Sequence, residues 1–141
     1  MAVDPQFVET PNPDWAVLTA VNATATKNHD GSGTLDTDVF AILTAGASGA
    51  YVESVVGCAK GSNVPSVLRL FLNNGSANTT ATNNTLIKEV GLPETTLSEV
   101  APLPAVEVLL GISIPAGYRI LACLGTAVSA GWAVTALGAD Y

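Results

Sequence analysis

The chain has 141 residues, the size of one domain that can bury its own hydrophobic core without a disulfide or a metal. Hydrophobic residues make up 48% of it and charged residues only 12%, so much of its outer surface must be uncharged, and we expect part of that surface to be buried against a neighbour. The net charge is −7 and the five Lys and Arg are scattered, which excludes a phosphate-binding stripe and hence a nucleic-acid partner.

The amino terminus indicates where the chain folds. Residues 1–5 lack the basic and apolar regions of a signal peptide, and no apolar run reaches the length of a membrane span. We therefore expect a chain that folds in a cytoplasm and has no membrane partner.

Residues 1–14 form a segment of their own, with three prolines that prevent a helix and three acidic residues that favour solvent. One interpretation is a frayed terminus. The other is an extended arm that becomes ordered only on a partner, with Phe7, Val8 and Trp15 as its apolar contacts. The predicted organisation is thus an extended N-terminal arm, 1–14, followed by a single β-sandwich domain, 15–141.

Short apolar runs between Gly-, Pro- and Asn-rich segments predict eight β-strands and no helix longer than a turn. Eight short strands in one domain favour an all-β fold, an eight-stranded β-sandwich of jelly-roll type. The predicted strands are residues 17–22, 39–44, 51–59, 67–72, 86–92, 105–110, 118–125 and 132–138.

Two of these runs also predict which faces are covered. Residues 39–44 are almost entirely apolar, as expected of a strand covered on both sides. In 67–72, alternate leucines are expected to face the core, while Arg69 and Phe71 point the other way. Tyr51 and Tyr118 can be placed on that same outer face, which would suit either a protein contact or a glycan groove. Residues 93–104, with three prolines, predict a long crossover between sheets.

Catalytic and metal-binding chemistry has little support in the sequence. The only histidine, His29, lies in a polar loop where we expect it to be exposed to solvent. No other histidine is present to activate a Ser, Cys or Thr nucleophile. We therefore expect no enzyme activity and no cofactor. The nearest approach to a calcium site is the set Asp30, Asp36 and Asp38, but their spacing does not match an EF-hand, and we assign no metal.

The two cysteines, Cys58 and Cys123, each lie inside a predicted strand. They could join two strands as a disulfide, or be two small buried side chains in a reducing compartment. We favour the second interpretation.

The overall pattern resembles a family of viral structural proteins. The run 67–75 and the terminal segments 114–118 and 131–136 are similar to those of small β-rich proteins of tailed bacteriophages, and the similarity spans about residues 16–141. It is to auxiliary capsid proteins, also called decoration or cement proteins, which sit on the outer face of an icosahedral shell, often as trimers. No catalytic or ligand residue is carried over from this resemblance.

The resemblance implies a structural virion protein on the capsid surface that clamps neighbouring subunits of the major capsid protein and associates as a homotrimer. Two alternatives stay open at this point, a head-fibre or tail-associated jelly-roll protein and a carbohydrate-binding module. The residues expected to contact the capsid or another subunit are Phe7, Val8, Trp15, Tyr51, Arg69, Phe71 and Tyr118.

Overall fold

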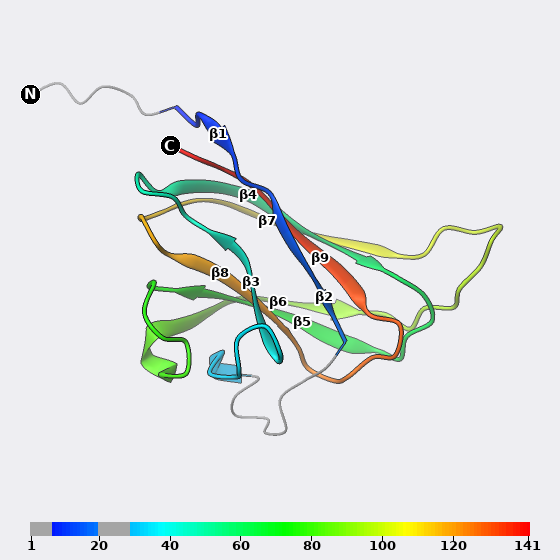
Figure 1. Cartoon of the computed structure of the whole chain (residues 1–141). Helices are drawn as coiled ribbons and strands as arrows, with labels where there is room; N and C mark the ends of the chain where they lie inside the picture. The colour runs from blue at the N-terminus through cyan, green and yellow to red at the C-terminus, as the bar shows by residue number, and fades with distance from the viewer. Residues whose placement is uncertain (1–6, 20–28) are drawn as a thin grey trace, which may run out of the picture.

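Two antiparallel sheets packed face to face make up the computed structural model, which describes residues 7–19 and 29–141 (Figure 1). Sheet A contains β1 (Thr10–Pro11), β2 (Asp14–Leu18), β9 (Trp132–Asp140), β4 (Ala50–Ala59) and β7 (Ala105–Ile114). Sheet B contains β3 (Val39–Thr44), β8 (Arg119–Leu124), β5 (Ser66–Asn73) and β6 (Asn84–Leu92). A 3-10 turn, η1 (Ala81–Asn83), precedes β6.

The strand pairing is nested. β2 pairs with β9, β3 with β8, β4 with β7 and β5 with β6, all antiparallel, so the chain folds like a long hairpin wrapped around a core. This is the jelly-roll arrangement, and the predicted fold class is confirmed. Of the predicted strands, 39–44 has the observed bounds, whereas 17–22 is observed at Asp14–Leu18, with residues 20–28 lying outside the described part of the chain.

The inner faces of the two sheets form the main core. Leu68 and Leu70 on β5 are fully buried there, and Leu72 packs against the same cluster, as the alternation predicts. Sheet A contributes Trp132, Val134 and Ala136 from alternate positions of β9. Burial of these side chains is the main stabilising contribution to the sandwich.

A second, smaller apolar cluster lies on the opposite side of sheet B. It consists of Val39, Phe71, Leu121 and Cys123, all buried, with Leu35 and Ala41 packed against them. Because β3 and β8 therefore have apolar neighbours on both faces, their sequences show no polar alternation. The prediction that 39–44 is covered on both sides is confirmed.

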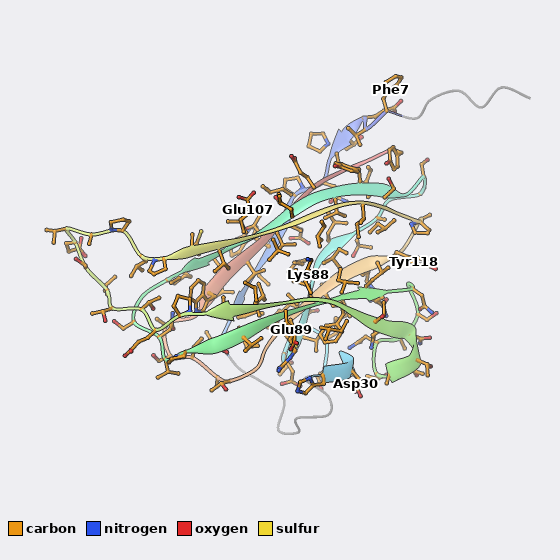
Figure 2. All side chains as sticks on the ribbon, turned by 180° about the vertical axis from the view of Figure 1, so that it is seen from behind. Phe7, Asp30, Lys88, Glu89, Glu107 and Tyr118 are labelled. Atoms are coloured by element: carbon orange, nitrogen blue, oxygen red, sulfur yellow. The ribbon has the colours of Figure 1, made fainter. Side chains whose placement is uncertain are left out.

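β7 is an edge strand of sheet A and β6 is an edge strand of sheet B. Both carry features that hinder pairing with a further strand. The β5/β6 register shifts between Leu70 and Phe71, and the β4/β7 register shifts near Gly111, whose φ is 60°. Charged side chains mark both strands, with Glu89 on β6 and Glu107 on β7 (Figure 2). Bulges and charges of this kind block edge-to-edge association, so partners are expected on faces and loops.

The described part of the N-terminal arm lies on the chain's own sheet. Thr10 and Pro11 pair with Asp140 and Ala139 at the end of β9. The Asn12 amide donates to the Asp140 carboxylate at 3.0 Å, and the same oxygen accepts from Gly46 N at 3.0 Å. The expectation that the arm becomes ordered only on a partner is therefore wrong for these residues, because β9 offers an unpaired edge within the same molecule.

Candidate interaction surfaces

The outer face of sheet A is broad and carries mostly apolar and neutral side chains. One row of side chains crosses four strands, since Trp15 lies opposite Thr135, Thr135 opposite Val56, and Val56 opposite Glu107. In the next row Leu137 and Leu109 flank Ser54. Three large apolar side chains of these rows stay in solvent: Trp15 is 62% exposed, Leu109 71% and Leu137 41%. Exposed apolar side chains gathered on one face mark a contact surface.

The two sheets differ in charge. The strands of sheet A carry four carboxylates, Asp14, Glu53, Glu107 and Asp140, and no Lys or Arg. The strands of sheet B carry three cations and one carboxylate, Arg69, Lys88, Arg119 and Glu89. Glu53 and Glu107 are the exposed carboxylates of β4 and β7, so sheet A presents an apolar surface with acidic groups, which is complementary to an apolar surface with basic groups.

A groove of about 400 Å³ lies between the arm and the outer face of sheet A. Val8, Pro11 and Pro13 of the arm form one wall, and the other side is lined by Tyr51, Glu53, Leu137, Gly138 and Ala139. Phe7, next to Val8, is 73% exposed. The groove is continuous with the apolar face through Leu137, so the arm enlarges the same surface.

The structure separates the predicted contact residues. Phe7, Val8 and Trp15 are exposed and, with half-buried Tyr51, belong to the arm and sheet A. Arg69 and Phe71 belong to sheet B, and Tyr118 lies immediately before β8 of that sheet. Arg69 and Phe71 share the outer face of sheet B, opposite Cys123 and Leu121, as predicted. The prediction is wrong for Tyr51, which lies on β4 of sheet A, and for Tyr118, which packs against the main core. Phe71 is fully buried because the loop before β3 covers it: a Cβ added at Gly31 would lie 3.2 Å from its ring.

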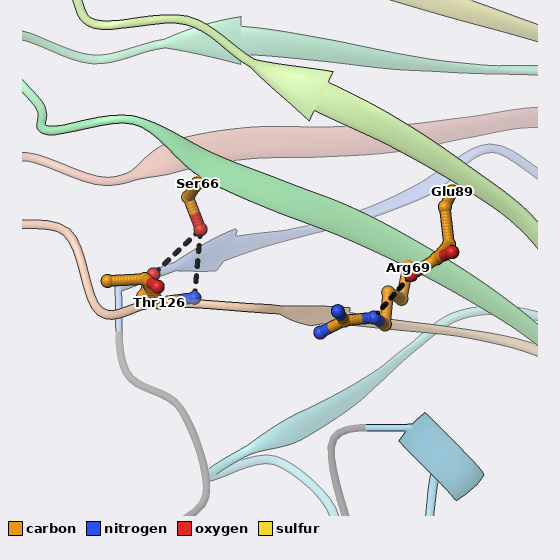
Figure 3. Close-up of polar contacts among 4 residues, drawn as sticks. All are labelled: Ser66, Arg69, Glu89 and Thr126. Carbon is orange, nitrogen blue, oxygen red and sulfur yellow. Dashed lines mark hydrogen bonds and ion pairs between the residues drawn. The ribbon is translucent and has the colours of Figure 1, made fainter. Parts of the chain in front are cut away.

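Arg69 is engaged within its own sheet. Its Nε donates to Glu89 Oε1 at 2.7 Å across the β5/β6 pair (Figure 3). Nearby, the Ser66 hydroxyl donates to Thr126 O at 2.8 Å and accepts from Thr126 N at 3.0 Å, which ties the start of β5 to the end of β8 (Figure 3). An exposed ion pair of this type contributes about 0–1 kcal/mol, so Arg69 orders the surface more than it stabilises the fold.

A small pocket of about 180 Å³ adjoins Tyr118, with Leu72, Asn74, Asn83 and Asn84 among its lining residues. The asparagine amides are used by the chain itself: Asn84 Nδ2 donates to Asp30 O and Asn78 O, and Asn74 Nδ2 to Asn83 Oδ1. These bonds hold the loops over the second apolar cluster. They leave the amides little capacity to recognise a sugar, so the pocket does not favour the glycan alternative.

The candidate calcium residues do not form a cluster. Asp30 Oδ1 accepts from Ser32 N at 2.9 Å and Asp38 Oδ2 accepts from Thr34 N at 3.1 Å, so both carboxylates cap turns of their own loop. Asp36 adopts a φ of 61°. Across residues 7–19 and 29–141 there is no group of three or more His, Cys, Asp and Glu side chains arranged to hold a metal. His29 is exposed, as predicted.

The two cysteines lie in different sheets and do not form a disulfide with each other. Cys58 on β4 is exposed, which differs from the expectation that both are buried, because its side chain lies on the outer face of sheet A, opposite Ala133 and Ala105. Cys123 is buried in the second apolar cluster, and this burial raises the pKa of its thiol to about 12. Cys123 is therefore protonated and unreactive at neutral pH, whereas Cys58 is accessible.

Comparisons with known proteins give no relative. No family model, no curated protein and no solved structure matches the chain. Within residues 7–19 and 29–141, no helix is long and apolar enough to cross a membrane.

Proposed function

We propose that this chain is a structural virion protein, a decoration or cement protein that binds the outer face of a tailed-phage capsid and stabilises the shell. The observation that carries the proposal is the outer face of sheet A, where Trp15, Leu109 and Leu137 are exposed on a sheet whose strands carry carboxylates and no Lys or Arg. Such a face suits a protein surface that is apolar with Lys and Arg around it. The compact jelly roll supplies a rigid support for it.

The proposed contact predicts a large loss of shell binding when its apolar side chains are replaced. In a variant carrying Trp15→Ser, Leu109→Ser and Leu137→Ser, we expect the affinity for shells to fall about 100-fold or more, because buried aromatic and aliphatic anchors dominate interfaces of this kind. The melting temperature should stay close to that of the wild type, since all three side chains are exposed. Co-sedimentation with shells purified from the virus whose genome encodes the chain measures the affinity.

The control for this experiment is Leu86→Ser, because Leu86 is also an exposed apolar side chain but lies on β6 of the other sheet. We expect it to bind as the wild type does. Equal binding by the triple variant would show that sheet A is not the contact. Failure of the wild type to bind shells would contradict the proposed function itself.

We also propose that the protein acts as a homotrimer, in which the groove between the arm and sheet A receives a neighbouring copy and the open face around Trp15 and Leu109 remains for the shell. Leu137 lies where the two contacts meet. A groove lined by Val8, Pro11, Tyr51 and Leu137 is costly to leave in water. Light scattering of the purified protein at micromolar concentration should give three times the 14.3 kDa of one chain. A single-chain mass, both free and on the shell, would contradict the trimer.

A further inference from the structure

The segment between β6 and β7, residues 93–104, extends past the ends of the strands at the opposite end of the molecule from Phe7 (Figures 1 and 2). Two of its large apolar side chains do not fold back onto the sandwich. Leu97 is 59% exposed and Val100 is 96% exposed. We call these twelve residues the 93–104 loop. An isolated apolar residue on a surface is ordinary, but two such side chains on one projecting loop form a potential anchor.

The base of the 93–104 loop is held firmly. Thr95 and Asn63 are both buried and pair as a short bridge: Asn63 N donates to Thr95 O at 3.1 Å and Thr95 N donates to Asn63 O at 3.0 Å. The Thr95 hydroxyl donates to Gly61 O at 2.6 Å, and Leu97 N donates to the Ser62 hydroxyl at 2.9 Å. The loop is thus fixed to the 60–65 segment up to Leu97.

Three prolines further restrict the same loop. Pro93 lies at its start, and Pro102 and Pro104 at its end. Each proline fixes φ before any partner binds, so less conformational entropy is lost when the loop is held in a complex. A projecting loop that is fixed at its base and restricted by prolines presents Leu97 and Val100 in a prepared position.

The charge of the 93–104 loop indicates the kind of surface that it fits. It contains Glu94 and Glu99, both exposed, and no Lys or Arg. Two carboxylates without a cation oppose binding to an anionic lipid surface, where basic residues supply the attraction. They favour a protein pocket with Lys or Arg at its rim, the same chemistry that the outer face of sheet A favours.

We propose that the 93–104 loop is a second attachment point, which inserts Leu97 and Val100 into an apolar pocket with a basic rim on a shell subunit. This inference rests on the proposed function and adds a contact to it. Because the loop and Phe7 lie at opposite ends of the sandwich, the loop contacts the shell far from the described part of the arm, whose groove receives the neighbouring copy (Figures 1 and 2).

The test compares two double variants with the wild type on shells purified from the encoding virus. Leu97→Asn with Val100→Asn removes the apolar contact, and we expect the affinity to fall about tenfold or more with an unchanged melting temperature. Glu94→Gln with Glu99→Gln removes the charge, and we expect weaker binding that depends less on salt between about 50 and 500 mM NaCl. Leu86→Asn is the matched control outside the loop.

The outcomes separate this inference from the proposed function. If both double variants bind shells as the wild type does while the sheet A variant fails to bind, the loop is no anchor and the proposed function stands. If the wild type does not bind shells, the proposed function fails and the loop contact fails with it. If vesicles containing phosphatidylglycerol retain the wild type but not the apolar double variant, the loop binds lipid and a protein pocket is wrong.

Discussion

Phe71→Ala is expected to lower the free energy of unfolding by about 3–5 kcal/mol, the usual cost of truncating a fully buried phenylalanine. The side chain fills the centre of the second apolar cluster, between Leu121 and Cys123 of β8 and the loop that precedes β3. Its removal leaves a cavity that the surrounding residues can fill only in part. Denaturant unfolding followed by tryptophan fluorescence measures the change, because Trp132 lies in the core between the sheets.

The same variant should loosen the covering loop before the sandwich unfolds. Asp38 N and Val39 N both donate to Thr34 O, and these amides are expected to exchange with deuterium faster in Phe71→Ala than in the wild type. The control is Leu86→Ala on β6, which is partly exposed and should cost under about 1 kcal/mol. A loss no larger than that of the control would contradict the role given to the second cluster.

The sandwich could be predicted from the sequence because its signals are local. Alternation with a period of two placed Leu68 and Leu70 in the core, and Gly-, Pro- and Asn-rich segments separated the strands. The described part of the arm could not be predicted in this way. Thr10 and Pro11 have no strand pattern, and their pairing with Asp140 and Ala139 joins residues near opposite ends of the chain. Such a contact follows from the position of the β9 edge after folding.

The residues of the candidate surface could be predicted only in part, because the sequence does not show which outward-facing positions a loop will cover. Phe71 and Leu109 both occupy positions that point away from the main core, and nothing in the alternation distinguishes them. Only the folded structure places a loop over Phe71 and none over Leu109. Leu109 and Leu137, two exposed apolar residues of the proposed contact, were not predicted from the sequence. Their signal was available, because both are large apolar side chains at outward positions of strands.

Asn63→Ala is expected to lower the free energy of unfolding by about 2–5 kcal/mol, although it removes only one side chain from a loop. Asn63 Nδ2 donates to Gly61 O and Gly131 O, and its Oδ1 accepts from Ala130 N and Gly131 N, both at 2.9 Å. Without the amide, Gly61 O keeps the Thr95 hydroxyl and Gly131 O keeps Lys60 N. The two N–H groups lose their acceptor in a largely buried site, which accounts for the cost.

This substitution should also weaken shell binding without altering any exposed residue of the 93–104 loop. The Asn63 side chain ties the 61–63 segment to Ala130 and Gly131, and Thr95 pairs with the Asn63 backbone at the base of that loop. Without the amide the 61–63 segment can move, and Thr95 and Leu97, which are bonded to it, move with it. Hydrogen exchange at Thr95 N and co-sedimentation with shells measure the two effects at a temperature where the variant remains folded.

The control is Asn74→Ala, an exposed asparagine whose side-chain amide bonds to Asn83 and Ser76 at the other end of β5. It should cost under about 1 kcal/mol and leave binding unchanged. If Asn63→Ala exchanges faster at Thr95 but binds shells as the control does, a fixed base is not needed for attachment, and the loop acts without preorganisation.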